Sequence, residues 1–385
     1  MAEKNLKSCW RRVSFGDVVR LSKARCADPL AEGVERFVGL EHLEPGDLRI
    51  RSWGNVADGV TFTGVFKPGQ VLFGKRRAYQ RKVAVADFSG VCSGDIYVFE
   101  SIDASVLLPE LLPFICQTDA FFEHAVGTSA GSLSPRTNWT SLANFEFALP
   151  PMAEQRRILG VLMALEESSS ANEALRISTG HLCYSLMADH FDAEHPACVK
   201  TSDIGTWHSG GTPTRSNTSY WGGSIPWISP KDMKTSEINS AEEKITEAGV
   251  GYGSKLMPKD TIMIVVRGMI LAHTFPTARI LVSAAFNQDM KALVVCDDFR
   301  PKYIQYWFQH AAPRYLQLIS ESSHGTKRLE SDKLFSLTVP KISLEDQDKF
   351  IEKVDGIRDA ERKASERKSA AIAMKRLFLN EKLKM

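Results

Sequence analysis

The most concentrated chemistry in the sequence is a basic segment at residues 75–82 (KRRAYQRK), which places five cations in eight residues and interleaves them with a tyrosine and a glutamine. Cations neutralise phosphates and release counterions from nucleic acid. Arg can also fork onto guanine O6 and N7, and Gln onto adenine N6 and N7. The alternative is a solvated, charged strand edge that blocks sheet aggregation. The segment favours DNA contacts by Lys75, Arg76, Arg77, Tyr79, Gln80 and Arg81.

Other basic residues are more dispersed, and each of them singly is typical of an ordinary surface charge. Two of them follow a glycine-containing loop at residues 325–326. We include as candidate DNA contacts one residue of the first half of the chain and five of the second half: Arg136, Arg215, Lys231, Arg267, Lys327 and Arg328.

Residues 127–131 (GTSAG) match the GxSxG pattern of serine hydrolases. That motif works as a sharp turn from a strand to a helix. Here the preceding residues, 121–124, have a helical pattern, and Pro135 blocks an immediate helix afterwards. A loop of small residues is the better interpretation, and a stand-alone cytosolic hydrolase using Ser129 with His124 is kept as an alternative.

Two further patterns indicate neither a phosphate loop nor a metal site. Residues 64–69 have the glycine spacing of a phosphate loop, but Gln70 and Val71 stand where Lys and Ser/Thr are needed. His190 and His195 lie near acidic residues without HExxH spacing, which favours a solvated linker. We therefore predict no catalytic residue and no metal ligand on this chain.

Two long helices are predicted to position these residues. From Met152 to about His190 there is no proline, and steps of three and four residues define a helical seam. At ~1.5 Å per residue this segment makes a rod of roughly 57 Å. The expected seam is Ile158, Val161, Leu165, Ser168, Asn172, Leu175, Thr179, Leu182 and Leu186. A second stripe follows near the end of the sequence: Phe350, Val354, Ile357, Ala360, Ala364, Ala371, Met374 and Phe378.

The segments before these helices have the pattern of strands followed by helices. Short β-branched and aromatic runs broken by glycine predict strands at 60–63, 70–73, 82–85 and 95–99, and again at 261–266, 279–282 and 291–295. Helical stretches follow at 109–126 and 301–321.

The chain repeats itself with a period of about 190 residues. Phe145-x-x-x-Leu149-Pro150 corresponds to Phe335-x-x-x-Val339-Pro340, and a helix opening with Glu and Gln follows each. The predicted organisation is α+β globule (1–150), helix (151–192), α+β globule (193–340) and helix (341–385).

Composition limits the class of protein. The 385 residues are 43% apolar and 24% charged, with a net charge of +2, which is ordinary globular composition. No apolar run approaches the ~18–20 residues of a membrane span, and we expect no secretory signal. The seven cysteines are scattered without a CxxC pair, which indicates a cytosolic protein without a disulfide framework or structural zinc.

The repeat of two globules and two helices resembles the specificity subunit of type I restriction–modification enzymes. Residues 210–214 (GGTPT), followed by 220–228 (YWGGSIPWI) and Asp232, resemble the opening of that family's target recognition domains. Residues 287–293 (NQDMKAL) resemble its central strands, and residues 149–158 (LPPMAEQRRI) its junction with the spacer helix. The first domain lacks the GGTP and YWGG runs, but residues 75–82 with 92–97 (CSGDIY) resemble a common variant.

The resemblance implies an α+β fold with two pseudo-repeated target recognition domains joined by two long helices, which pack as an antiparallel coiled coil. Each domain would read one half of a bipartite, asymmetric site in double-stranded DNA. Two modification subunits would carry S-adenosylmethionine and methylate a flipped adenine. Restriction subunits would use ATP and Mg for translocation and cleavage, so this cytoplasmic chain would need no cofactor. A helical scaffold without a nucleic-acid role is the remaining alternative.

Overall fold

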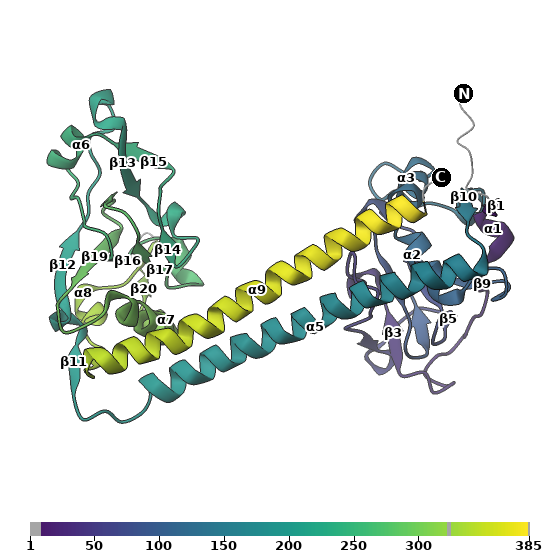
Figure 1. Cartoon of the computed structure of the whole chain (residues 1–385), viewed down its shortest axis with the longest axis horizontal. Helices are drawn as coiled ribbons and strands as arrows, with labels where there is room; N and C mark the ends of the chain where they lie inside the picture. The colour runs from purple at the N-terminus through teal and green to yellow at the C-terminus, as the bar shows by residue number, and fades with distance from the viewer. Residues whose placement is uncertain (1–8, 322–324, 384–385) are drawn as a thin grey trace. The chain divides into compact units, whose positions relative to one another are not determined.

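The computed structural model describes residues 9–321 and 325–383, which form two compact units (Figure 1). Unit 1 comprises Met1–Glu173 and Ser365–Met385, and unit 2 comprises Ala174–Ala364. The two long helices are α5 (Met152–Phe191) and α9 (Leu344–Lys382). Each of these helices contributes one half to each unit.

Unit 1 is built on two four-stranded sheets, ordered β2-β9-β6-β7 and β4-β3-β8-β5. The first sheet is antiparallel, and its inner strand β6 is buried along its whole length because Val71, Leu72 and Phe73 have no polar side. The strands are β1 (Arg11–Ser14), β2 (Val19–Leu21), β3 (Arg36–Val38), β4 (Gly54–Asn55), β5 (Gly64–Phe66), β6 (Val71–Gly74), β7 (Val83–Val85), β8 (Gly90–Cys92), β9 (Ile96–Ser101) and β10 (Glu146–Leu149). The helices are α1 (Phe15–Val18), η1 (Leu40–His42), η2 (Val56–Asp58), η3 (Ala78–Gln80), η4 (Pro109–Leu111), α2 (Leu112–Cys116), α3 (Asp119–Gly127) and α4 (Trp139–Ala143).

Unit 2 has a five-stranded sheet, β12-β19-β16-β17-β14, and a three-stranded sheet, β15-β13-β18. The strands are β11 (Cys198–Lys200), β12 (Gly205–Ser209), β13 (Trp221–Ile228), β14 (Glu237–Ile238), β15 (Glu243–Ile245), β16 (Ile262–Val265), β17 (Thr277–Ile280), β18 (Ala285–Phe286), β19 (Met290–Val295), β20 (Ser320–Glu321), β21 (Lys327–Arg328) and β22 (Thr338–Pro340). The helices are η5 (Thr201–Asp203), η6 (Thr218–Tyr220), η7 (Pro230–Asp232), α6 (Glu247–Gly251), η8 (Met269–Ala272), α7 (Pro301–Gln317) and α8 (Ser331–Leu334).

The two units repeat one topology. Strands β2, β9, β6 and β7 of unit 1 follow the same order as β12, β19, β16 and β17 of unit 2. In both units a strand near the start of the globule pairs antiparallel with the strand that precedes a long helix, as β1 with β10 and as β11 with β22. The internal repeat inferred from sequence is therefore present in the fold.

Near the start of each long helix, one buried glutamine side chain binds the preceding loops: Gln155 in α5 and Gln347 in α9. We call each of these hydrogen-bond clusters a glutamine joint. The Gln155 side chain accepts a hydrogen bond from Leu108 N (3.0 Å) and donates to the carbonyls of Val106 (2.8 Å) and Pro150 (2.9 Å). Gln347, 192 residues later, accepts from Arg300 N (2.7 Å) and donates to two carbonyls in the same way (3.0 and 3.1 Å). Both joints connect the helix to the loop before the helical layer, so they fix the direction in which the helix leaves its own unit.

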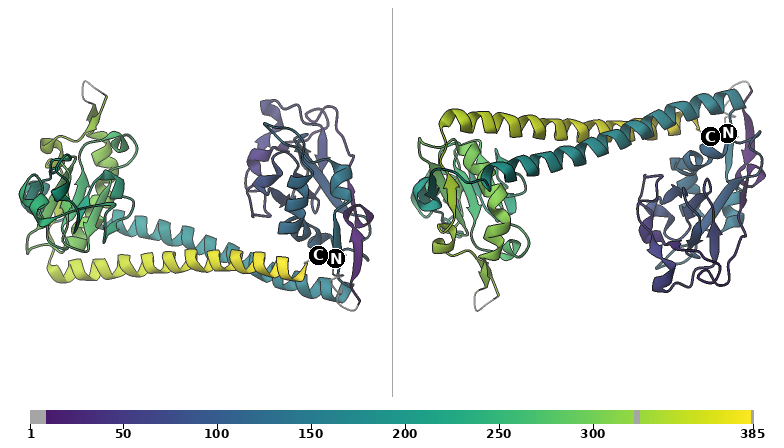
Figure 2. Two further views of the ribbon diagram at one scale, coloured as in Figure 1. Left: turned by 90° about the horizontal axis from the view of Figure 1, so that it is seen from above. Right: turned by 90° about the horizontal axis from the view of Figure 1, so that it is seen from below.

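In unit 1 the first half of α5 packs antiparallel against the last half of α9 (Figure 2). Lys375, which is almost fully buried, pairs with Glu166 and donates to Gly46 O (3.3 Å). Lys368 pairs with Glu173 at 2.9 Å. Breaking a buried pair such as that of Lys375 with Glu166 would leave an uncompensated charge, so this pair favours the observed register of the two helices.

In unit 2 the last half of α5 packs against the first half of α9. The His190 ring stacks on Phe350 with the ring centroids 4.0 Å apart, and its Nε2 lies 3.0 Å from Tyr303 Oη. Burial lowers the pKa of His190 to about 4, and the charges of His195 and Lys353 add to this effect. The prediction that this histidine lies in a solvated linker is wrong, because the aromatic side chains of α7 and α9 surround it.

The predicted seam of α5 is partly wrong. Val161, Leu175 and Leu182 are exposed, whereas Leu162 and Cys183, each one residue later than a predicted seam position, are buried. Because α5 carries apolar side chains on more than one side, their spacing alone does not determine which stripe of side chains is buried. The buried stripe is Gln155, Ile158, Leu162, Thr179, Cys183, Met187 and Phe191. On α9 the predicted stripe is largely buried, with Met374 exposed and Leu379 buried instead.

Most of the expected strands and helices are present with shifted ends. The run at 60–63 is irregular, because the pairing of this part of the chain with strand β8 begins only at Gly64, the first residue of β5. The expected helix at 109–126 is divided into η4, α2 and α3, with Thr118 as the N-cap of α3. The expected helix at 301–321 ends at Gln317, and residues 320–321 form strand β20.

Candidate nucleic-acid interface

The basic segment of unit 1 is a loop between β6 and β7, not a strand edge. It contains the single turn η3, which is flanked by Arg77 (φ 52°) and Arg81 (φ 57°) in the left-handed region. This backbone turns the segment back on itself within eight residues. Tyr79 lies exposed in η3, and Gln80 beside it is half-buried.

Two arginines of different loops share the carboxylate of Asp95. Arg76 Nη1 lies 3.2 Å from one carboxylate oxygen, and Arg136 Nε lies 2.8 Å from the other. Burial alone would raise the pKa of Asp95, but the hydrogen bonds and charges of Arg136 and Arg76 outweigh it and lower this pKa below its ordinary value. Asp95 is therefore ionised and holds the two guanidinium groups side by side.

Further cations surround this pair. Ser134 Oγ accepts hydrogen bonds from Arg76 (3.0 Å) and from Arg77 (3.2 Å). Lys75 Nζ lies 4.5 Å from the ring centroid of Tyr97, and burial lowers the pKa of this lysine. The positive charge of Arg25 lowers it further, so Arg25 is close to the group. Sequence reasoning missed Arg25, because nothing in its neighbourhood along the chain marks it.

The last two cations of the segment face inward. Arg81 pairs with Asp119, donates to Gln117 O (3.1 Å) and lies over the Phe122 ring at 4.6 Å. Lys82 Nζ donates to Leu40 O at 2.7 Å. These contacts give both residues a role in stabilising unit 1, so the basic surface consists of Lys75, Arg76, Arg77 and Arg136.

Unit 2 places an arginine pair at the equivalent backbone positions. In unit 1, Arg76 and Arg136 form an isolated antiparallel bridge, and in unit 2 Arg267 and Arg328 do the same. The flanking hydrogen bonds also match. Thr137 N bonds Lys75 O at 3.1 Å and Arg77 N bonds Pro135 O at 2.7 Å, while Leu329 N bonds Val266 O at 2.9 Å and Gly268 N bonds Lys327 O at 3.0 Å.

The acidic partner recurs as well, although more loosely. Asp289 precedes β19 as Asp95 precedes β9, and its carboxylate lies 3.9 Å from Arg267 Nη1. Arg328 pairs with Glu330 instead, at 3.2 Å. Lys327 pairs with Glu321. Three of the residues expected to contact DNA in the second half, Arg267, Lys327 and Arg328, thus lie together.

The other two expected residues of unit 2 form a separate group. Arg215 makes a two-bond contact with Glu243, and its guanidinium carbon lies 3.9 Å from the Trp221 ring centroid. Lys231 is exposed in η7. The hydrogen bond from Arg215, together with the charges of Arg215 and Lys231, lowers the pKa of Glu243 despite its partial burial. This group combines a cation with a tryptophan surface, which suits stacking as well as phosphate contact.

The serine and histidine of the hydrolase alternative are not arranged as a catalytic pair. Ser129 Oγ donates to Ala125 O at 2.7 Å, and His124 Nε2 lies 2.7 Å from Ser141 O. The segment before Ser129 is helix α3, so the strand-to-helix turn that the motif requires is not formed.

Within residues 9–321 and 325–383, no group of three or more His, Cys, Asp or Glu side chains is arranged to hold a metal ion. Over the same residues, no helix combines the length and apolar character that crossing a membrane requires.

The fold and the twice-repeated arginine pair define a class of two-unit α+β proteins with long connecting helices. Residues 197–368 match the family model described as type I restriction modification DNA specificity domain. Over 155 residues the chain is 39% identical to the EcoR124I/EcoR124II specificity subunit of Escherichia coli, which covers 40% of this chain and 38% of that relative. Over 159 residues it is 32% identical to the MjaIX specificity subunit of Methanocaldococcus jannaschii, covering 39% and 35%. These matches span little more than a third of each relative's length.

Solved structures extend the likeness in fold to the whole chain. The S subunit of a type I restriction–modification system from M. genitalium has a TM-score of 0.62 at 13% identity, with 100% of this chain and 98% of that chain covered. The corresponding subunit from Thermoanaerobacter tengcongensis has a TM-score of 0.52 at 18% identity, with 98% and 97% covered. The expected fold class is confirmed. The comparisons thus place a type I restriction modification DNA specificity domain in the second half of this chain, and the fold of the chain as a whole is like that of these two S subunits.

Proposed function

We propose that this chain is the sequence-specific DNA-recognition subunit of a type I restriction–modification complex and reads a bipartite, asymmetric site. Segments 1–150 and 193–340 are its recognition domains, and segments 151–192 and 341–385 are its spacer helices. The observation that supports this most directly is the arginine pair at one backbone position of each unit, Arg76 with Arg136 and Arg267 with Arg328. A surface for one half-site recurs in the second unit with different neighbours.

In this proposal the cations divide into two kinds of contact. Arginine pairs held beside an aspartate suit phosphate oxygens, which set the register of a protein on the duplex without reading sequence. Arg77, Tyr79 and Gln80 of unit 1, together with Arg215 and Lys231 of unit 2, are the candidates for contacts to base edges. The chain carries out no catalysis itself. Two modification subunits supply S-adenosylmethionine and methylate adenine, and restriction subunits supply the ATP- and Mg-dependent steps.

Mapping methylated bases across the genome tests the proposal. Cells with the chain should carry a two-part adenine motif with a fixed gap, and the motif should vanish when the gene is deleted. Re-expression of the chain is the control and should restore the same motif. A genome whose methylated motifs are the same with and without the chain would contradict the proposal.

The length of the spacer helices gives a second test. Inserting or deleting about one helical turn, four residues, in the exposed part of both α5 and α9 should change the preferred gap between the half-sites. The sequence of each half-site should stay the same. An unchanged gap would show that the helices do not set the spacing.

A further inference from the structure

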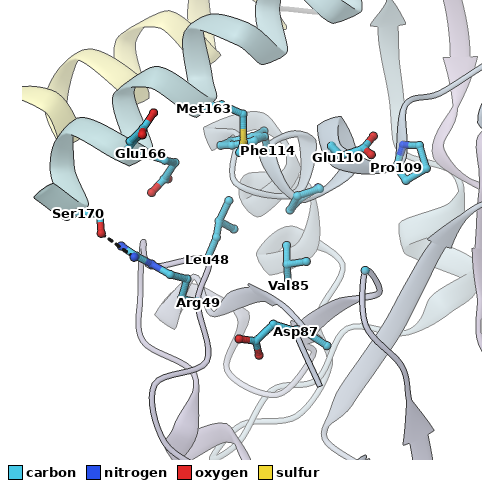
Figure 3. A pocket seen from close by; sticks show the side chains of 14 residues that line it. Leu48, Arg49, Val85, Asp87, Pro109, Glu110, Phe114, Met163, Glu166 and Ser170 are labelled. Atoms are coloured by element: carbon cyan, nitrogen blue, oxygen red, sulfur yellow. Dashed lines mark hydrogen bonds between the residues drawn. The ribbon is translucent and has the colours of Figure 1, made fainter. Parts of the chain in front are cut away.

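Unit 1 contains a cavity of about 700 Å³ that the DNA-binding proposal does not use (Figure 3). Its apolar lining includes Leu48, Val85, Phe114 and Met163, which come from the loop between η1 and β4, strand β7, helix α2 and helix α5. Met163 is about half exposed, so the cavity opens at the surface. A volume in this range is typical of binding sites.

The edge of the cavity is acidic. Asp87, Glu110 and Glu167 are exposed, and within residues 9–321 and 325–383 no ion pair engages their carboxylates. Glu166 lies beside them and is neutralised by Lys375. Among the lining residues the single cation is Arg49, which donates to Ser170 Oγ at 2.6 Å and lies 3.7 Å from Asp47. The opening therefore attracts cations and repels phosphates.

In unit 2 the residues equivalent to part of this cavity lining contact one another. Aligning Gln155 with Gln347 shifts the numbering by 192 residues. Glu110, Phe114, Met163 and Glu166 then correspond to Lys302, Tyr306, Asp355 and Arg358. In unit 2 these four residues contact each other: Lys302 Nζ lies 2.8 Å from Asp355, Tyr306 donates to the same carboxylate, and the Arg358 guanidinium lies 4.4 Å from the Tyr306 ring centroid. The polar groups of unit 2 are thus satisfied within the unit.

The wall of the cavity that contains Gly69 and Val85 also differs between the two units. The hydrogen bond from Gly69 N to Ala86 O in unit 1 matches that from Asp260 N to Ile280 O in unit 2, and both donors have positive φ. The strand registers likewise match Val85 to Arg279, and the bridge of Arg49 with Val85 matches the pairing of β14 with β17. In unit 2 the Arg279 guanidinium binds both Asp260 and Glu237. In unit 1 a glycine and a valine leave that space empty.

We propose that this cavity is a docking site for a basic, apolar segment of a partner protein. An aliphatic or aromatic side chain of the segment enters between Leu48, Val85 and Met163, and neighbouring Lys or Arg side chains pair with Asp87, Glu110 and Glu167. Charge complementarity excludes nucleic acid as the occupant, because three unpaired carboxylates face the opening. The equivalent residues of unit 2 are engaged with one another, so the segment binds unit 1 alone, once per chain.

The test uses the full chain labelled with ¹³C-methyl methionine and a short peptide, Ac-Lys-Leu-Phe-Arg-amide. The Met163 methyl signal should shift in a saturable way as this peptide is added. The charge-reversed peptide Ac-Glu-Leu-Phe-Glu-amide should bind at least about tenfold more weakly, because like charges would face each other. Met269, which is similarly exposed but lies in unit 2, serves as the internal control and should not shift.

Two variants then locate the binding. Glu110→Lys copies the lysine of unit 2 at an exposed position and should weaken the basic peptide about tenfold. Glu146→Lys makes the same charge change elsewhere on unit 1 and should leave binding unchanged. The double variant Gly69→Asp with Val85→Arg copies the ion pair of unit 2 into the cavity and should abolish binding. If that double variant fails to fold, Glu110→Lys decides.

Several results would overturn the inference. These are the absence of a saturable Met163 shift, equal binding of both peptides, an equal shift of Met269, and unchanged binding to Glu110→Lys. None of these results depends on DNA, so the docking site can fail while the DNA-recognition proposal stands.

Discussion

Units 1 and 2 share a backbone but differ in how they use their charges. Unit 1 gathers Lys75, Arg76, Arg77 and Arg136 around the single carboxylate of Asp95. In unit 2, Arg328 and Lys327 have acidic partners of their own, and Arg267 lies 3.9 Å from Asp289. The basic surface of unit 1 therefore has more uncompensated positive charge.

The comparison shows that the shared backbone, which we call the frame, is independent of the side chains proposed to contact DNA. The frame consists of backbone hydrogen bonds at matching positions, in which no side chain takes part. The side chains on that frame can change without changing the fold. Under the proposed function, this separation is what allows one chain to read two different half-sites.

The largest effect is expected from changes in the basic surface of unit 1. Arg76→Ala combined with Arg77→Ala should weaken binding to the complete DNA site by about 3 kcal/mol, because two cationic contacts are lost, and should relax recognition of one half-site. The dependence of log K on log[salt] should become shallower by about two units. Fluorescence anisotropy with DNA duplexes altered in one half-site at a time measures both effects.

Matched variants sharpen that result. Arg12→Ala with Arg20→Ala removes two exposed arginines that pair with Glu146 and Glu100, and should leave DNA binding unchanged. Arg267→Ala with Arg328→Ala should affect the other half-site and with a smaller loss. If the Arg76/Arg77 variant binds both half-sites like the wild type, the basic loop is only a solvated surface. If salt has no effect on binding, the scaffold alternative gains support.

A smaller effect is expected at the glutamine joints, where the two units are alike. Gln155→Ala and Gln347→Ala should each lower the free energy of unfolding by about 2 kcal/mol, since each leaves one buried N–H and two carbonyls without a partner. Urea denaturation monitored by circular dichroism measures this. Gln155→Glu is a useful companion, because it keeps the acceptor but loses the two donated bonds. A loss in one variant only would show that the joints are not equivalent.

The smallest expected effect concerns a histidine that unit 2 alone contains at this position. His190 corresponds to Lys382 of unit 1 when the glutamine joints are aligned. Because burial lowers the pKa of His190 to about 4, the folded unit keeps it neutral, and stability is complete above its ordinary pKa of 6.5. As the pH falls from 6.5 to 4, unit 2 should lose stability progressively, and by less in total than in either glutamine variant, because solvent screens a group that is only half-buried; this group adds no further loss below pH 4.

Hydrogen exchange measured by mass spectrometry reports on each unit separately. Between pH 6.5 and 4, after correction for intrinsic exchange rates, protection should fall in the α7 and α9 peptides that face His190. Peptides of unit 1 should change less. The His190→Gln variant should flatten the difference, and an unaltered pH profile in that variant would assign the effect to the carboxylates around it.

Much of the architecture could be predicted from the sequence because its signals are local. The long proline-free stretches, the strand runs and the repeated Phe-x-x-x-Leu/Val-Pro junctions each depend on residues close together in the chain. The phase of α5 was missed because exposed residues such as Leu182 are as apolar as the buried ones. Burial on that helix is decided by contacts with α9 and with the body of each unit.

The candidate surface was predictable in part. The basic run marks Arg76 and Arg77, but nothing local shows that Arg81 turns inward to Asp119, since its left-handed backbone occurs without glycine. The sharing of Asp95 by two arginines joins residues 41 positions apart, so it depends on tertiary structure. The cavity of unit 1 arises from side-chain differences between the repeats, and no local pattern in the sequence marks it.

Lys375 has one more consequence for the helix pair of unit 1. If α9 slid along α5 by a single turn, about 5.4 Å, the ammonium group would leave both Glu166 and Gly46 O and lie nearer Leu162 or Ser170, neither of which carries a charge. Leaving a buried charge without its partner costs about 3–5 kcal/mol. The two helices of unit 1 therefore cannot slide gradually along each other, and their axial register has one discrete value.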